Sequence, residues 1–309
     1  MGCAVVGSSV ATAVVFPGQG TQTPGMGEPW RSTPAWEIVE RAEKAVDLPL
    51  AHLLLDATAE ELSRTREAQL SVLLASLMAW DALKNRMEAP VAFAGHSLGQ
   101  ITALIASGAL SLEDGVGLAV ARADCTQAAA DAAPGRMAAL IGADIDTAEK
   151  ACTDVDAWVA NDNAPGQVVI GGTAEGVDAA TARGGDLGVR RVMALNVGAA
   201  FHTPMMQAAA DALAPTLAAT AFAVPAAPVV SNTDARPYAG AGGWPERLAQ
   251  HLVTPVRWRS TMETLVTDLG SNAFVEVGPG RVLAGLAKRT VGAAVTLRSV
   301  TVPTDAEDA

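Results

Sequence analysis

Short apolar runs alternate along the chain with longer stretches in which apolar residues recur every three or four positions. A short apolar run bounded by Gly, Pro or polar residues is typical of a buried strand, and the longer periodicity is typical of an amphipathic helix. The longest helical stretch, "REAQLSVLLASLMAWDALKNRM", spans residues 66–87. Five runs predict strands: "TAVVF" (12–16), "VAFA" (91–94), "APVVSN" (227–232), "NAFVEVG" (272–278) and "VTLRSV" (295–300). Because helical stretches separate them, the pattern predicts a mostly parallel sheet covered on both faces.

The pattern changes between residues 135 and 197, where four shorter strand candidates appear. They are "RMAALIGA", "AWVAND", "GQVVIGG" and "VRRVMALNV", and two helical stretches, "DTAEKACTDV" and "TAEGVDAATARGG", separate them. The order strand, helix, strand, strand, helix, strand is typical of a ferredoxin-like unit. We therefore predict a main domain formed by residues 1–134 and 198–309, with residues 135–197 inserted as a small subdomain.

Composition and charge exclude several classes of protein. The 309 residues are 50% hydrophobic and carry a net charge of −12, with an isoelectric point near 4.7, so broad binding to nucleic acid or to an anionic membrane is not expected. Cys3, Cys125 and Cys152 lie far apart, which argues against a zinc site and against a disulfide framework. No apolar stretch has membrane-spanning length. We expect a soluble, cytoplasmic monomer without metal, whose acidic end "PTDAEDA" is frayed and whose first dozen residues have no assigned role.

The sequence "GHSLG" at residues 95–99 lies where a predicted strand gives way to a predicted helix. A serine between two glycines at such a junction is typical of a nucleophile elbow, because the tight turn leaves no room for side chains around the serine. The helix that follows would direct free N–H groups at an oxyanion formed there. The alternative is an ordinary turn whose serine hydroxyl is satisfied by a neighbour.

A nucleophilic serine needs a base, and the chain has four histidines. His96 adjoins Ser97 and would point away from it on an elbow, and His52 lies in a helical stretch where packing explains it. His202 and His251 remain. Pro204 predicts that a helix begins just after His202, which would place His202 on a loop, where catalytic side chains often lie.

Another helix is predicted in "SLEDGVGLAVARADCTQAAADAA", with Ser111 as its N-cap because Glu113 and Asp114 follow in the first turn. Arg122 lies within this helix. From the helix alone, Arg122 is best interpreted as a surface arginine paired with Asp124 or Glu113.

Seven segments together resemble the malonyl-CoA:acyl carrier protein transacylase family, which includes the acyltransferase domains of polyketide synthases. In chain order they are "FPGQGTQTPGMG", "AGHSLGQITALIASGAL", "VARADCTQ", "NDNAPGQVVIGG", "AAFHTPMM", "TPVRW" and "VEVGPGRVLAGLAKR". The resemblance runs from about Val14 to Arg289. It implies an α/β fold with an α/β-hydrolase-like main domain, a parallel sheet and an inserted ferredoxin-like subdomain.

The resemblance also implies roles for individual residues. Ser97 would be acylated, and His202 would be its general base and then the acid that protonates the leaving thiol. The backbone N–H groups of Gln19 and Leu98 would form the oxyanion hole. Without the family, the "PGQG" segment that contains Gln19 is only a turn after the first strand.

Substrate contacts follow from the same resemblance. Arg122 would hold the free carboxylate of malonyl-CoA, since a guanidinium group binds a carboxylate with two parallel hydrogen bonds. Phe201 resembles the malonyl-type pattern and would exclude a branched α-carbon, so malonyl is expected rather than methylmalonyl. The remaining candidates for substrate binding are His96, Asn161, Asn163 and His251.

The partner implied by the family is an acidic acyl carrier protein, so a chain that is itself acidic needs a local basic patch to dock it. The candidates are Arg190, Arg191, Lys288 and Arg289. Two positions depart from the family pattern: Gln100 replaces the usual glutamate, and His251 replaces a glutamine that commonly orients the catalytic histidine.

The resemblance therefore predicts a ping-pong transfer of malonyl from malonyl-CoA to the phosphopantetheine thiol of a carrier protein, without a metal or redox cofactor. Two alternatives stay open. One is the same acyl transfer with another donor, and the other is an acyl-thioester hydrolase that uses the same serine.

Overall fold

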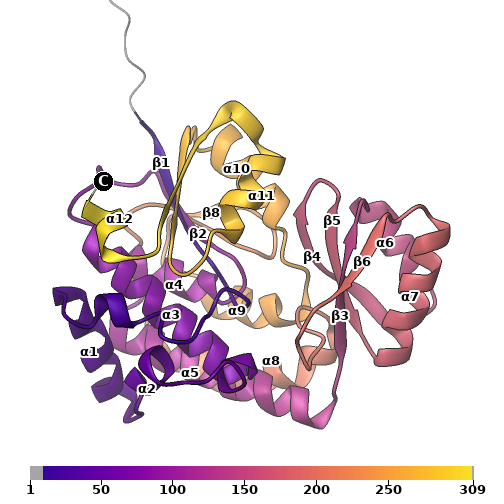
Figure 1. Ribbon diagram of the computed structural model, residues 1–309, viewed down its shortest axis with the longest axis horizontal. Coiled ribbons are helices and arrows are strands. Elements are labelled where there is room, and N and C mark those ends of the chain that lie inside the picture. Colours follow the sequence, from indigo (N-terminus) through magenta and orange to yellow (C-terminus); the bar gives the residue numbers. More distant parts are fainter. Residues whose placement is uncertain (1–9, 308–309) are drawn as a thin grey trace, which may run out of the picture.

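The computed structural model describes residues 10–307, which form two units built on separate sheets (Figure 1). The larger sheet has six strands in the order β10-β9-β1-β2-β7-β8, and only β8 is antiparallel to its neighbour. These strands are β1 (Thr12–Phe16), β2 (Ala92–Gly95), β7 (Val229–Val230), β8 (Pro237–Tyr238), β9 (Ala273–Val277) and β10 (Thr296–Val300). The mostly parallel sheet that the apolar runs predict is confirmed.

Helices cover both faces of this sheet because alternate side chains of each buried strand point to opposite sides. Val14 and Phe16 belong to one apolar cluster, and Ala13 and Val15 to another. The second face is covered by α10 (Trp258–Thr267) and α11 (Val282–Thr290). The first is covered by α1 (Glu37–Val46), α2 (Ala51–Leu55), α3 (Thr65–Leu83), α4 (Gly99–Ala106), α5 (Leu112–Ala132), α8 (Gln207–Ala219), α9 (Trp244–Val253) and α12 (Pro303–Glu307).

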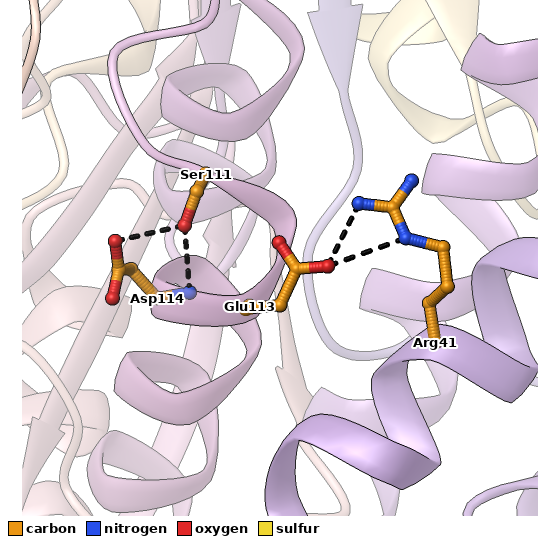
Figure 2. Close-up of polar contacts among 4 residues, drawn as sticks. All are labelled: Arg41, Ser111, Glu113 and Asp114. Atoms are coloured by element: carbon orange, nitrogen blue, oxygen red, sulfur yellow. Dashed lines mark hydrogen bonds and ion pairs between the residues drawn. The ribbon is translucent and has the colours of Figure 1, made fainter.

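Helix α5 begins at the predicted N-cap. The Ser111 hydroxyl accepts a hydrogen bond of 3.0 Å from the Asp114 N–H and donates one to the Asp114 carboxylate (Figure 2). In the same view Glu113 binds Arg41 of α1 at 2.7 Å, so the acidic first turn of α5 also ties it to a neighbouring helix. The cap satisfies a donor that the first helical turn would leave open.

The smaller sheet is antiparallel, with four strands in the order β4-β5-β3-β6. Its strands are β3 (Arg136–Ile141), β4 (Ala157–Ala164), β5 (Gln167–Gly172) and β6 (Arg191–Ala194). Helices α6 (Ile145–Ala151) and α7 (Ala174–Asp186) pack on one face, on the right of Figure 1. The chain order and the strand order are those of a ferredoxin-like unit, as the sequence predicts.

The two sheets are joined by backbone contacts between β4 and the loop before α10. The Val256 N–H donates to the Ala160 carbonyl at 2.9 Å, and the Asp162 N–H donates to the Val256 carbonyl at 2.9 Å. An ion pair between the half-buried Arg259 and the buried Asp162, at 3.0 Å, lies beside them. These contacts fix the free face of the smaller sheet against the carboxyl ends of β1 and β2.

The acidic C-terminal segment differs from the expectation. Residues 303–307 form α12, the Asp305 carboxylate accepts a hydrogen bond of 2.8 Å from the Thr301 N–H, and Ala306 is buried in the main core. The prediction of a frayed end is therefore wrong for these residues, because Asp305 provides a local cap and Ala306 an apolar anchor. Cys3 and the unassigned first segment lie largely outside the described residues.

For cysteine pairing, metal binding and membrane crossing, the structure gives observations only within residues 10–307. Within them Cys125 and Cys152 are free thiols. In the same part of the chain, His, Cys, Asp and Glu side chains form no group of three that could hold a metal ion. None of the described helices combines the length and apolar character that crossing a membrane requires.

The crossing of α4 over the end of β1 gives a stability prediction. A Cβ atom added to Gly99 would lie 2.3 Å from the Phe16 carbonyl oxygen, whereas one added to Gly117 of α5 would meet no described atom within 4 Å. Gly99→Ala should therefore lower the free energy of unfolding by roughly 1–3 kcal/mol. Gly117→Ala, the matched control, should raise it by up to about 1 kcal/mol. Urea denaturation measures both, and equal shifts would contradict the close crossing.

Candidate active site

The turn between β2 and α4 holds Ser97 in a strained conformation. Its φ angle is +53°, in the left-handed region that costs a non-glycine residue about 1–3 kcal/mol. A Cβ atom added to Gly95 would lie 1.8 Å from the Gly99 carbonyl oxygen, so no side chain fits there. The chain therefore turns sharply at the carboxyl edge of the sheet, and the serine hydroxyl stands at the tip of the turn. This is the elbow geometry that "GHSLG" predicts.

His202 is the histidine that reaches this serine. Its Nε2 atom lies 2.7 Å from the Ser97 Oγ atom, and its Nδ1 atom lies 2.7 Å from the His251 carbonyl oxygen. Because a carbonyl only accepts, Nδ1 carries the proton and Nε2 is left as the acceptor for the serine hydroxyl. The partner of Nδ1 is a backbone carbonyl, where serine hydrolases of the α/β-hydrolase type use an acidic side chain.

The position of His202 is set by the loop before α8. Its φ angle is +59°, and the chain then enters the short helical turn Pro204–Met206, which Thr203 caps. The loop that carries His202 therefore ends where the helical turn begins at Pro204, as the sequence predicts. The side chain is only 4% exposed.

Burial keeps His202 neutral. Desolvation, with a further contribution from the positive charge of Arg122, lowers its pKa from 6.5 to about 3. The neutral imidazole can therefore accept a proton from the serine throughout the physiological pH range.

The structure gives different surroundings to the other two histidines near Ser97, His96 and His251. The Nε2 atom of His96 lies 2.8 Å from the Asn163 Oδ1 atom, so its ring is engaged away from Ser97. The His251 ring stacks on His202 at 4.8 Å between centroids, is 3% exposed and is not among the residues that line the cleft. The contact that the structure does show for His251 is through its backbone carbonyl, a group that any residue type supplies, and the substrate contact stays a prediction.

Arg122 is buried beside Ser97. It is 6% exposed, its Nη2 atom lies 3.3 Å from the Ser97 Oγ atom, and its Nη1 atom donates to the Gln69 Oε1 atom. Gln69 is held in turn by Thr126, at 3.1 Å. Among residues 10–307 no carboxylate pairs with this guanidinium group. Burial lowers its pKa to about 10, which still leaves it charged at neutral pH.

The interpretation from the helix alone is therefore wrong. Glu113 pairs with Arg41, and Asp124 pairs with Arg66. A buried positive charge without a counter-ion is costly, and an anionic group next to the serine would offset that cost.

A cleft of about 270 Å³ opens between the two units above Ser97. Gln19 and Leu98 line it, and neither backbone N–H has an acceptor among the described residues. Two free N–H groups beside a serine hydroxyl can hold an oxyanion. The other lining residues from the predicted set are His96, Ser97, Arg122, Asn161, Asn163, Phe201 and His202.

Sequence reasoning missed two polar residues of this region, Gln69 and Asn232. Gln69 fixes the Arg122 guanidinium group, and Asn232 accepts a hydrogen bond of 2.9 Å from the Ser97 N–H. Each is about 1% exposed. The sequence offered one sign of each residue, a polar side chain in a largely apolar segment. Gln69 lies in the apolar helix α3, and Asn232 lies just beyond the apolar strand β7.

Comparison with known proteins identifies the same architecture. The sequence profile of the acyl transferase domain family matches residues 13–306. The malonyl CoA-acyl carrier protein transacylase of Bacillus subtilis is 36% identical over 284 residues, which covers 90% of this chain and 89% of that protein. The transacylase of Escherichia coli K12 is 37% identical over 288 residues, with 90% and 92% covered.

Solved structures agree with these relatives. The malonyl-CoA:acyl carrier protein transacylase of Xanthomonas oryzae superposes with a TM-score of 0.90 at 36% identity, covering 96% of each chain. A malonyl-transacylase solved in complex with its type II polyketide synthase acyl carrier protein has a TM-score of 0.91 at 33% identity, covering 96% of this chain and 98% of that one.

The low pKa of His202 predicts an unusual pH profile for the reactivity of Ser97. A histidine with an ordinary pKa would be protonated below about pH 6.5. Here the reaction of Ser97 with a fluorophosphonate probe should keep its rate down to about pH 5, because His202 is still neutral there. Arg122→Gln should move the acidic limb to higher pH, since removal of the positive charge raises the pKa of His202.

Initial rates of labelling across the pH range measure both effects. Arg41→Gln is the control, because it removes an exposed arginine that pairs with Glu113. A wild-type limb centred near pH 6.5 would contradict the account.

Proposed function

Since the chain belongs to the acyl transferase domain family, we propose that it transfers a malonyl group from malonyl-CoA to the phosphopantetheine thiol of an acyl carrier protein, through an acyl-enzyme at Ser97. The curated relatives at 36–37% identity are named malonyl transacylases. The observation that carries the proposal is the buried Arg122 guanidinium group, which lies 3.3 Å from the Ser97 hydroxyl and has no carboxylate partner within residues 10–307. A thioester donor with a free carboxylate satisfies both groups at once.

The first half-reaction forms the acyl-enzyme. As the Ser97 Oγ atom attacks the thioester carbon, His202 Nε2 takes the hydroxyl proton, and the carbonyl oxygen becomes an oxyanion facing the Gln19 and Leu98 N–H groups. The C–S bond then breaks, and CoA leaves with the proton that His202 carried. The His251 carbonyl stabilises the transient imidazolium through Nδ1.

The second half-reaction reverses these steps with a different thiol. The phosphopantetheine thiol gives its proton to His202, and its sulfur attacks the acyl carbon. The Ser97 oxygen leaves and recovers the proton from His202. Malonyl is then bound to the carrier protein, and the enzyme returns to its starting state without a metal or redox cofactor.

Selectivity is assigned to Arg122 and Phe201. Gln69 holds Nη1 of the guanidinium group, and the other end faces the cleft, where it would bind the malonyl carboxylate. Phe201 precedes His202 and also lines the cleft, so its ring would oppose a methyl branch on the α-carbon. Asn161, Asn163 and His96 add polar groups to the wall of the cleft.

Carrier docking is assigned to two exposed basic pairs. Arg190 and Arg191 lie at β6, and Lys288 and Arg289 lie near the end of α11. Leu195, just after β6, and Val282, at the start of α11, line the cleft, so both elements reach it, and the basic pairs lie at the other end of each element. An acidic carrier would meet both pairs as its thiol enters.

We further propose that residues 135–197 act as a small domain that covers the cleft, and that the enzyme works as a cytoplasmic monomer. The free thiols of Cys125 and Cys152 suit a reducing compartment.

Intact-mass measurement tests the donor and the serine together. Malonyl-CoA should add one malonyl group to the wild-type chain, and holo carrier protein should remove it and gain the same mass. Ser97→Ala should show no adduct, because no other residue is proposed to be acylated. Ser111→Ala, a cap far from the cleft, is the control. An adduct that survives in Ser97→Ala would overturn the proposed acyl-enzyme.

Arg122→Ala tests the choice of donor. Loss of a charge-assisted hydrogen-bond pair should slow acylation by malonyl-CoA about 100-fold, while acylation by acetyl-CoA changes by less than about threefold. Rapid-quench measurement of acyl-enzyme formation gives both rates, and Arg41→Ala is the matched arginine control. Equal losses for the two donors would show that Arg122 does not bind the carboxylate.

A further inference from the structure

The strained turn at Ser97 is held by a set of hydrogen bonds that involve only amide groups, and two of its members, Asn232 and Gln100, come from separate elements. We propose that Asn232, supported by Gln100, is a positioning residue that sets the direction of the Ser97 hydroxyl and leaves the Leu98 N–H free for the oxyanion. This inference rests on the proposed role of Ser97 as the nucleophile.

Asn232 connects the two ends of the turn. Its Oδ1 atom accepts from the Ser97 N–H at 2.9 Å, and its Nδ2 atom donates to the Gly95 carbonyl at 2.8 Å. These partners fix the orientation of the amide, since an N–H can only donate and a carbonyl can only accept. The side chain therefore holds the residue before His96 and the residue after it at a set separation.

The sheet register brings Asn232 to this place. Strand β7 runs parallel to β2, with Val229 opposite Phe93 and Val230 opposite Ala94. The chain beyond β7 therefore arrives beside the turn that follows β2, and Asn232 lies at 1% exposure against it. The sequence separation between Asn232 and Ser97 is 135 residues.

Gln100 fixes Asn232 in turn. Its Oε1 atom accepts a hydrogen bond of 2.9 Å from the Asn232 N–H, and the Asn232 carbonyl accepts one of 3.0 Å from the Arg257 N–H. Gln100 is 2% exposed, and its Nε2 atom has no partner among residues 10–307. The Oε1 atom of Gln100 is thus the atom that holds the Asn232 backbone in place. A glutamate, usual at this position in the family, would supply an equivalent oxygen.

This arrangement decides which N–H groups can serve the reaction. The Ser97 N–H is engaged by Asn232, whereas the Leu98 N–H has no acceptor among the described residues and lines the cleft. If Asn232 were absent, the Ser97 N–H would also be free, and the strained turn would lose the contact that spans it. The hydroxyl would then no longer be held at 2.7 Å from His202 Nε2.

The test uses the full-length enzyme and two readouts: the maximal rate of acyl-enzyme formation from malonyl-CoA and the rate of labelling by a fluorophosphonate probe. Asn232→Ala should lower both about 100-fold, the size expected when a reacting group moves by about 1 Å. The KM for malonyl-CoA should stay within about threefold, because Asn232 does not line the cleft.

Three further variants separate a positioning role from an effect on folding. Ser271→Ala removes a buried hydroxyl that bonds the Ala11 and Ala273 carbonyls at the start of β9, and it should lower stability but not the rates. Gln100→Leu should slow acylation about tenfold, and Gln100→Glu should recover most of that loss because it keeps the acceptor oxygen. Urea denaturation gives the stability of each variant.

The proposal is overturned if Asn232→Ala keeps both rates within about threefold of wild type while losing as much stability as Ser271→Ala. If Asn232→Ala does not fold, the Gln100→Leu and Gln100→Glu pair decides, and equal rates for the two would overturn it. A wild-type chain that reacts with the probe but not with malonyl-CoA would reject the proposed donor alone. The rates of labelling by the fluorophosphonate probe would then still test the positioning role of Asn232.

Discussion

The left-handed turn at Ser97 is the constraint on which the rest of the site depends. Ser97 adopts a φ of +53° because β2 must end and α4 must begin within four residues, and Gly95 and Gly99 make that crossing sterically possible. The turn raises the hydroxyl above the carboxyl edge of the sheet, where a loop from far along the chain can reach it. The strain of the turn is offset by packing and by hydrogen bonds from neighbouring elements.

The hydrogen bond between Ser97 and His202 connects the turn to the rest of the fold. It couples a residue of the first half of the main unit to one that follows the smaller sheet, 105 residues later. The His251 carbonyl orients the imidazole without adding a negative charge, and the buried Arg122 adds a positive one. Burial and the charge of Arg122 keep the base neutral, whereas the bond to the His251 carbonyl favours its protonated form. An incoming carboxylate would reduce the effect of Arg122 by pairing with it. Binding of a diacid donor would thus raise the basicity of His202 when a base is needed.

Much of this arrangement follows from local sequence. The apolar runs predict five strands of the larger sheet, the alternation in residues 135–197 predicts the ferredoxin-like unit, and "GHSLG" between a strand and a helix predicts the elbow. Each of these depends on contacts within a few residues of the chain or on one repeated period. Pro204 similarly marks the loop that carries His202, although local sequence left His251 as an equal candidate.

Long-range contacts explain what the sequence did not predict. The sequence suggested a surface position for Arg122 because two possible ion-pair partners, Glu113 and Asp124, lie nearby in the chain. In the structure these carboxylates form ion pairs with Arg41 and Arg66 of other helices. Asn232 stands out locally only as a polar residue at the end of an apolar run, and its contact with Ser97 is created by the pairing of β7 with β2. The role of His251 resides in a backbone carbonyl, which residue type does not reveal. The predicted roles of Arg122, Gln19 and Leu98 came from the family resemblance and not from their local sequence.

A crystal structure of the malonyl acyl-enzyme would show where the strained turn at Ser97 places the acyl group. The account predicts an ester at the Ser97 Oγ atom, with its carbonyl oxygen about 2.7–3.1 Å from the Gln19 and Leu98 nitrogens. The free carboxylate should bind the Arg122 guanidinium group with two hydrogen bonds. An ester carbonyl turned away from both N–H groups, or a carboxylate that leaves Arg122 unpaired, would contradict it.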